Sequence, residues 1–238
     1  MVSLLVGALL AVSLASNDQT DRDMQQAVAR RLADHVLPTD GVVIVSVKDG
    51  IVTLRGNVGS IWSRSEAARE ALRAPGVTSI VNALTIDRRD DEDIDDQIDD
   101  WLYRYVFYSV FDAVSWTVTN GVVSLSGVVT DAYKTSAIAD LVARVDGVQA
   151  VTNAIRVSDT SDADVALGIA IANEIYRLPI FWSYALLARP PIHVLVDQGT
   201  VTLVGRVDTA IERARILRIV YEIAGEVAID DHLVVRRR

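Results

Sequence analysis

Asp49-Gly50-Ile51-Val52-Thr53-Leu54-Arg55-Gly56 decides the fold, because this pattern occurs three times in the 238 residues. It returns as Asn120-Gly121-Val122-Val123-Ser124-Leu125-Ser126-Gly127 and again as Gln198-Gly199-Thr200-Val201-Thr202-Leu203-Val204-Gly205. Each copy has a further glycine 26 positions after the first, at Gly76, Gly147 and Gly225. Similarity at fixed spacing is the signature of a repeat architecture. The sequence therefore predicts three copies of one structural unit.

Alternating residues predict a β-hairpin in each unit. Val43, Val45 and Val47 alternate with other residues up to Asp49-Gly50, and the run from Ile51 continues with a period of two. Glycine adopts a positive φ without steric cost, which two-residue hairpin turns require. We therefore expect a turn glycine at the same place in all three units: Gly50, Gly121 and Gly199.

Helices are expected on both sides of each hairpin. Residues 60–72 of the first copy are amphipathic and rich in Ala, Arg and Glu, which favours a helix. Gly76 is expected to be its C-cap, as are Gly147 and Gly225 in the other copies. Residues 77–86 predict a third strand. Another helix precedes each hairpin, at residues 21–35, 92–105 and 162–176.

The element order is therefore αββαβ, which predicts an α+β fold. Each module is expected to be a small three-stranded sheet packed on two helices. Polar breaks at residues 88–91 and 158–161 separate the units, which we place at residues 21–88, 92–158 and 162–238. The third unit is divergent and has about seven extra residues before its hairpin, around residues 178–191.

The N-terminus predicts export from the cytoplasm. Val2 to Ala15 form an apolar stretch that is shorter than the roughly 20 residues of a membrane-spanning helix. Ser13-Leu14-Ala15 is a small-x-small site of the kind that signal peptidase accepts. We expect residues 1–15 to be a signal peptide. A basic segment before the apolar stretch is missing, so retention as a short anchor is the alternative.

Composition excludes several classes of function. The chain has no cysteine and a net charge of −9, which argues against thiolate chemistry and against nucleic-acid binding. His35, His193 and His232 occupy different positions in their repeats and form no metal-binding spacing. No glycine-rich phosphate loop is present. We therefore expect no enzyme activity, no cofactor and no metal.

The acidic charge is concentrated in the second unit. Residues 90–100 contain eight carboxylates, around the start of that unit's first helix. A calcium-binding loop would need a glycine at its sixth position and would not tolerate the isoleucine found at its fourth. The preferred interpretation is that the carboxylates crowd a helix N-terminus, where the helix dipole favours them. Cation binding is the alternative.

Aromatic residues are the candidate contact residues. Seven of the 14 aromatic residues lie within 101–116, and four more lie within 176–184. Ile94, Ile98 and Leu102 form the core stripe of their helix, so Trp101 and Tyr103 should face solvent. Exposed aromatic residues favour a partner, either a membrane surface or another protein surface. The contact candidates are Trp101, Tyr103 and Phe107, followed by Phe181 and Trp182.

The repeated hairpin, the glycine 26 residues later and the Asn-Ala strand resemble the BON (bacterial OsmY and nodulation) domain. The resemblance implies non-enzymatic periplasmic modules that bind anionic phospholipid and serve envelope integrity or the osmotic-stress response. An interaction scaffold, with its aromatic clusters packed between repeats or subunits of a homo-oligomer, is the alternative function. The sequence does not decide which lipid or envelope protein is the partner.

Overall fold

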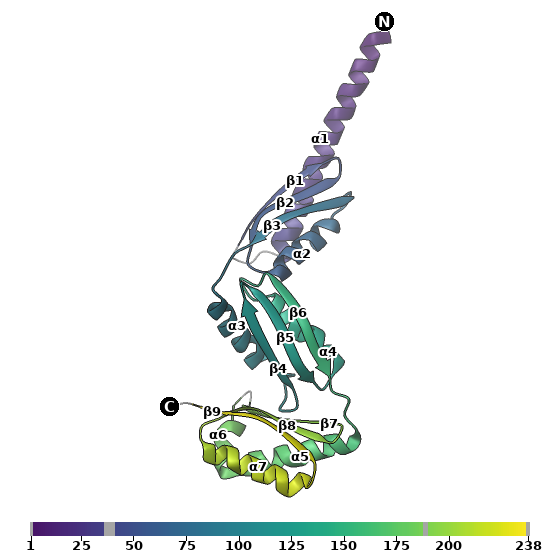
Figure 1. The fold of residues 1–238 in the computed structure, drawn as a ribbon. Helices are drawn as coiled ribbons and strands as arrows, with labels where there is room; N and C mark the ends of the chain where they lie inside the picture. The colour runs from purple at the N-terminus through teal and green to yellow at the C-terminus, as the bar shows by residue number, and fades with distance from the viewer. Residues whose placement is uncertain (1, 36–40, 188–189, 237–238) are drawn as a thin grey trace. The chain divides into compact units, whose positions relative to one another are not determined.

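Each of the three repeats folds into a three-stranded sheet with its helices on one face (Figure 1). The computed structural model describes residues 2–35, 41–187 and 190–236. In every module the first two strands form a hairpin, and the third pairs with the second after a helical crossover. The α+β architecture with three tandem modules is therefore confirmed.

The first module contains two helices and three strands. In the first sheet β1 and β2 are antiparallel, whereas β2 and β3 are parallel, with Leu54 opposite Val45 on one side and Asn82 on the other. Val52 and Leu54 point into the core, where they meet Val28 and Leu32 of the first helix. The elements are α1 (Val2–His35), β1 (Val42–Lys48), β2 (Ile51–Val58), α2 (Ile61–Leu72) and β3 (Ser79–Ile86).

The second module repeats this order. Its first helix buries Ile94, Ile98 and Leu102, while most of its carboxylates face solvent. The recurrence of the apolar residues every four positions predicts this arrangement. The strand order β4-β5-β6 makes β4 an edge strand. The elements are α3 (Asp91–Arg104), β4 (Ala113–Thr119), β5 (Val122–Val129), α4 (Ala132–Ala143) and β6 (Ala150–Val157).

The third module adds a short helical insertion between its first helix and its hairpin, where the extra residues were expected. Ile171 and Ile175 pack under the sheet with Val201 and Leu203. The elements are α5 (Asp162–Arg177), the 3-10 turn η1 (Pro179–Phe181), α6 (Trp182–Ala185), β7 (Ile192–Asp197), β8 (Thr200–Val207), α7 (Ala210–Ala224) and β9 (Ala228–Val235).

An aspartate from the first helix binds the hairpin turn of every module. Asp49-Gly50 and its two equivalents have positive φ at both positions, which defines a type I′ turn. The Asp91 carboxylate accepts hydrogen bonds from the backbone N–H groups of Asn120 and Gly121, both at 2.8 Å. Asp21 and Asp164 do the same in the other modules.

The later glycines do not all cap helices. Gly225 is the C-cap of α7, as expected. In the first module the C-cap is Arg73, and Gly76 lies beyond it in the turn that leads to β3, with φ of +83°. Gly147 likewise follows the end of α4 by four positions, with φ of +90°. The C-cap prediction was wrong for these two glycines, because both helices end before their glycine is reached.

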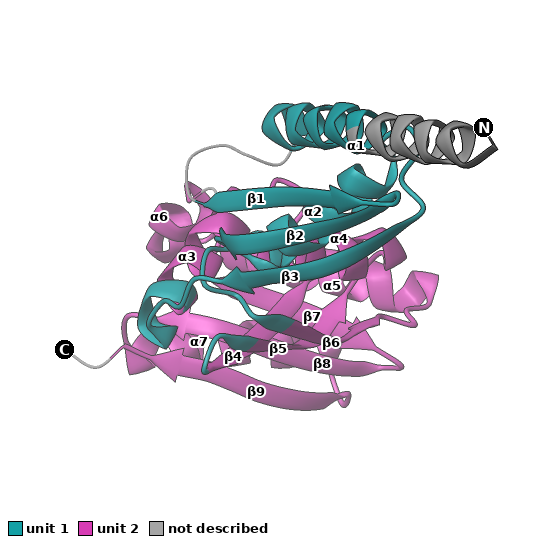
Figure 2. Cartoon of the chain, turned by 90° about the horizontal axis from the view of Figure 1, so that it is seen from above, with its two compact units in different colours: residues 1–94, 120–122, 143–150 teal, residues 95–119, 123–142, 151–238 magenta. Residues whose placement is uncertain are grey.

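The chain divides into two compact units (Figure 2): residues 1–94, 120–122 and 143–150 form the first, and the remaining residues form the second.

The backbone of α1 is helical from Val2, while the side chains of the predicted signal peptide, residues 1–15, lie outside the described residues. Across the described part of the chain, no single helix meets the length and hydropathy requirements of a membrane span. Only the bent pair of α5 with residues 179–185 meets them together, on length and composition alone.

Candidate functional site

The aromatic cluster of the second module separates into two surfaces. Trp101, Tyr103 and Phe107 are all exposed, and Phe107 retains 57% of its accessible surface. Phe107 makes edge-to-face contacts with Tyr105, at 5.7 Å between ring centroids, and with Tyr133 of α4, at 6.0 Å. We call Tyr105, Val106, Phe107 and Tyr133 the aromatic patch; Trp101 is exposed on α3 before it.

Sequence reasoning missed Tyr133. This residue is close to the start of α4, and nothing in the local pattern distinguishes it from an ordinary helix residue. Its contact with Phe107 joins segments 26 positions apart, and Val106 beside it is the most exposed of the patch residues. The hydroxyl of Tyr105 is buried and has no hydrogen-bond partner among the described residues. Burial raises the pKa of this Tyr105 hydroxyl, with the Tyr133 and Asp112 charges acting in the same direction. The patch therefore combines broad apolar exposure with little polar character.

Tyr103 lies on a different surface, in a groove of about 670 Å³ in the second unit. One wall is the α3 face that carries Asp95, Asp96 and Asp99, together with Trp116 of β4. The opposite wall is the outer face of the third sheet, where His193, Val204 and His232 lie side by side in register across three strands. We call this space the acidic groove. Tyr103 and Trp101 thus do not form one site.

The aromatic candidates of the third module also separate. Phe181 is completely buried among the core residues of that module, with its ring 5.9 Å from Tyr184. Phe181 is therefore a core residue, and the expectation that it is a contact residue was wrong. Trp182 is exposed, with its indole N–H donating to the Arg177 carbonyl at 3.3 Å. Phe181 ends η1 and Trp182 begins α6, and the first of these neighbouring side chains is buried while the second is exposed.

A buried ion pair supports the segment between α3 and β4. Asp112 is fully buried and accepts a hydrogen bond from the Lys134 ammonium at 2.7 Å; Lys134 is only 4% exposed. The same carboxylate accepts from the backbone N–H and hydroxyl of both Ser109 and Thr130. Burial opposes ionisation of Asp112, but the ammonium and these hydrogen bonds outweigh it and hold its pKa below the usual value. This network fixes the backbone next to the aromatic patch.

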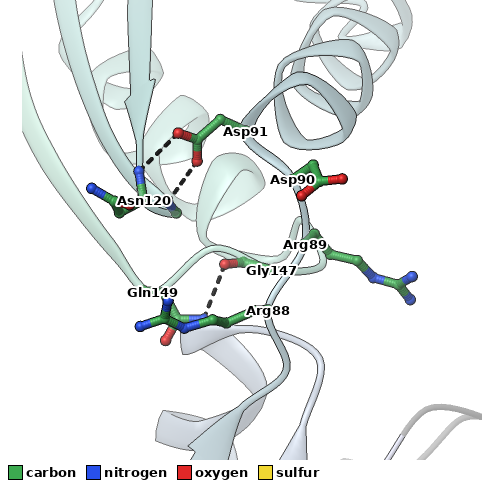
Figure 3. Close-up of a pocket in the computed structure, with 8 residues that line it drawn as sticks. Arg88, Arg89, Asp90, Asp91, Asn120, Gly147 and Gln149 are labelled. Carbon is green, nitrogen blue, oxygen red and sulfur yellow. Dashed lines mark hydrogen bonds between the residues drawn. The ribbon is translucent and has the colours of Figure 1, made fainter.

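A polar hollow of about 250 Å³ lies where the first linker meets the turns of the second module (Figure 3). Asp91 binds the hairpin turn here, and the Arg89 side chain points away from it. The Gln149 amide donates to the carbonyls of Ile86 and Asp87, both at 3.4 Å. Asp91 thus holds the hairpin turn and Gln149 holds the linker, so we interpret the hollow as a structural contact. Its lining residues are Arg88, Arg89, Asp90, Asp91, Asn120, Gly121, Gly147 and Gln149.

No catalytic arrangement emerges from these surfaces. Within residues 19–35, 41–187 and 190–236, no group of three or more His, Asp or Glu side chains could hold a metal ion. His193 is buried near Tyr108 and the Ser109 carbonyl, and His232 pairs with Asp230 at 3.0 Å on the surface. His193 and His232 therefore lie in different environments, and His35 is the exposed last residue of α1.

Comparison with known proteins gives one family. No curated protein matches the chain. Among solved structures, CdsD, a structural protein of the type III secretion system of Chlamydia trachomatis, is 17% identical, with 90% of this chain and 92% of that chain covered at a TM-score of 0.26. The periplasmic domain of the type III secretion inner-membrane protein PrgH from S. typhimurium is 11% identical, with 82% and 94% covered at a TM-score of 0.20. Likeness at these TM-scores supports no conclusion about this chain.

The family model describes the BON domain and matches three segments, residues 20–88, 90–159 and 182–237. The segments cover well over half of the chain, and each contains one hairpin, one crossover helix and the third strand of a module. The third match begins after α5, in the divergent part noted in the sequence. The chain belongs to the BON domain family, of which it contains three tandem copies.

Proposed function

We propose that the chain is a non-enzymatic protein of the bacterial cell envelope that contacts phospholipid membrane surfaces through the aromatic patch of its second module. Membership of the BON family supports a non-catalytic, envelope-associated role in general. Phospholipid contact, a periplasmic location, a cleaved signal peptide and a part in the osmotic-stress response are the finer elements of the proposal. The domain boundaries at residues 21–88, 92–158 and 162–238 belong to it as well.

The exposed aromatic patch is the observation that carries the proposal. Val106 and Phe107 follow the end of α3 with most of their apolar surface in water, and Trp101 is exposed in the last turn of α3. Aromatic side chains with an apolar body prefer the headgroup region of a bilayer. Burial of apolar surface is worth about 25 cal/mol per Å², so transfer of Phe107 alone would contribute roughly 2–3 kcal/mol. Marginal, reversible membrane binding needs about 5–6 kcal/mol, so Phe107 would supply about half and the other exposed side chains of the patch the rest.

The charges around the patch set the salt dependence. Asp100 and its neighbours on α3 face solvent, and the Arg104 guanidinium is 3.8 Å from the Asp100 carboxylate. An anionic bilayer repels such carboxylates over about 8–10 Å at physiological salt. Binding that depends on aromatic insertion should therefore strengthen on anionic vesicles as salt increases. A protein held by basic residues would show the opposite trend.

Vesicle flotation with the full chain tests this proposal. We expect binding to phosphatidylglycerol-containing vesicles that falls at least five-fold in Phe107→Ala, because the inserted ring is lost. Tyr221→Ala is the matched control, since Tyr221 is equally exposed but lies on α7 of the third module. Absence of flotation, or equal binding by Phe107→Ala and Tyr221→Ala, would contradict membrane contact through the patch.

A separate observation, the contacts between consecutive modules, restricts the scaffold alternative to packing of the patch between subunits. In the first unit Gly147 donates its N–H to the Gly59 carbonyl at 2.8 Å, and the Arg144 guanidinium lies 4.0 Å above the Trp62 ring. In the second unit the Val194 N–H donates to the Val110 carbonyl at 2.8 Å. These contacts hold neighbouring modules together without the aromatic patch. Light scattering on the full chain distinguishes a monomer from a homo-oligomer that covers the patch.

A further inference from the structure

We infer that the acidic groove is a docking site for an extended basic segment of a partner protein. This function goes beyond membrane contact, because the groove lies on the face of α3 that carries Tyr103 rather than on the aromatic patch. The inference depends on three features that converge on the groove. These features are a row of carboxylates, two aromatic rings and an available strand edge.

The carboxylates give the groove its charge. Asp95, Asp96 and Asp99 line it from α3, and all three are exposed. Arg206 and His232 line the opposite wall, so with neutral histidines the lining carries three negative charges against one positive charge. A groove lined by one dominant sign of charge concentrates ligands of the opposite sign. The complementary ligand is therefore cationic.

The aromatic rings lie beside these carboxylates. The indole N–H of Trp116 donates to the Asp95 carboxylate at 2.7 Å, which fixes both side chains at the wall. Tyr103 lies one helical turn after Asp99 on the same face of α3. Lysine and arginine side chains bind favourably over aromatic faces when a carboxylate is nearby. Tyrosine and tryptophan at an acidic wall thus favour basic side chains over a simple inorganic cation.

The strand edge explains why the ligand should be extended. The Val114 N–H donates to the Tyr108 hydroxyl at 2.7 Å and so points away from the sheet, at the outer edge of β4. Backbone groups of alternate residues point the same way in an edge strand, so Trp116 presents its N–H and C=O at this edge. Both residues line the groove. Because the Val114 N–H is occupied by Tyr108, an extended peptide would pair with β4 through the N–H and C=O of Trp116, while its alternate side chains reach the carboxylates.

The other modules lack this combination, although they share the fold. The positions equivalent to Asp95, Asp96 and Asp99 are Gln25, Gln26 and Ala29 in α1. In α5 they are Gly168, Ile169 and Ala172. The carboxylate row is therefore not needed to build the module. It is a property of the second copy, at the surface that the third copy completes.

Fluorescence anisotropy with two labelled peptides tests the inference on the full chain. The probes are octapeptides of alternating threonine and lysine, or of alternating threonine and glutamate. We expect the lysine probe to bind at least ten-fold more tightly than the glutamate probe, with binding that weakens as salt increases. N-methylation of alternate backbone nitrogens of the lysine probe should abolish binding, because it removes the strand pairing. Equal binding of the two charge forms, or no binding of either, would overturn the inference.

Matched variants locate the binding. Asp96→Asn combined with Asp99→Asn should weaken the lysine probe about three- to ten-fold, since each exposed charge pair contributes modestly. Asp100→Asn removes the same charge from the same helix outside the groove and should leave binding unchanged. Tyr103→Ala should weaken binding, whereas Trp101→Ala should not. Equal losses in the groove variants and in their controls would show non-specific attraction and refute the site. Vesicle flotation of Asp96→Asn remains unchanged if the groove and the aromatic patch act separately.

Discussion

Replacement of Lys134 by methionine tests the buried ion pair that supports the aromatic patch. The substitution keeps the length and the apolar stem of the side chain but removes the ammonium group, which lies 2.7 Å from the Asp112 carboxylate. Asp112 would remain fully buried with only neutral donors from Ser109 and Thr130. Removal of one partner of a buried pair costs about 3–5 kcal/mol. The four remaining hydrogen bonds place the expected loss in the free energy of unfolding near the lower end, about 3 kcal/mol.

Urea unfolding followed by circular dichroism measures this loss. Arg177→Met is the matched control, because Arg177 pairs with Glu174 at 2.6 Å but is largely exposed. An exposed pair contributes about 0–1 kcal/mol, so this control should change the midpoint little. Asp112→Asn in the Lys134→Met background should restore part of the loss, because the uncompensated charge is then removed. A loss below about 1 kcal/mol, or one equal to that of Arg177→Met, would refute the energetic role assigned to the pair.

Two further predictions concern the glycines with positive φ and the acid stability. Gly127→Ala should lower the free energy of unfolding by about 3 kcal/mol or more, because φ is +119° and a Cβ would collide with the Ala113 carbonyl. Gly199→Ala, at φ of +75° with open space around it, should lower the free energy of unfolding by only about 1 kcal/mol. Urea unfolding measures both variants, and equal losses in the two would contradict this reasoning. Hydrogen bonds from the Ser161 hydroxyl and backbone N–H, which outweigh burial, hold the pKa of Asp164 below its usual value. Its contribution to stability is therefore present above about pH 4 and is lost as pH falls through the lowered pKa, so Asp164→Asn should show a weaker pH dependence of melting below pH 4 than the parent chain.

The repeat architecture could be predicted because its signals are local. A type I′ turn needs two successive residues with positive φ, and Gly50, Gly121 and Gly199 supply one of them at regular spacing. Alternation around each turn then assigns the inward face, as Val52 and Leu54 show. The resemblance to BON domains rested on these same residues. Family membership therefore followed from short-range geometry that a sequence displays directly.

The candidate site was harder to predict because it depends on distant pairs. The exposure of Trp101 follows from its position around α3, whereas Phe181 lies in a 3-10 turn without the period of a long helix. Asp112 and Lys134 are 22 positions apart, and neither local pattern suggests burial. Pairs of this kind become visible only when the elements are packed. For the same reason the sequence predicted a crowded helix N-terminus, or a cation site as the alternative, and not one wall of a groove.

The third copy shows that one contact can be kept with different chemistry. In the first copy the Asn82 amide donates to the Arg64 carbonyl at 2.9 Å, and its oxygen accepts from the Leu84 N–H. In the third copy Asp231 accepts from the Leu233 N–H and pairs with the Arg213 side chain. The third copy has lost the asparagine, but the hydrogen bond to the strand N–H two residues later is retained. A carboxylate with an arginine partner replaces an amide with a carbonyl partner.

The hydrogen bond from Val194 to Val110 has a consequence for how the chain can be divided. Residues Ile192 to Val196 of β7 are all buried, although β7 is the terminal strand of its sheet. A polypeptide cut at residue 162 would keep this strand but lose the segment that covers it. An uncovered, apolar edge strand of this kind pairs with other molecules and promotes aggregation. Residues 108–111 of the preceding module thus protect the edge of β7. Production of the third module alone would require a substitute for these residues.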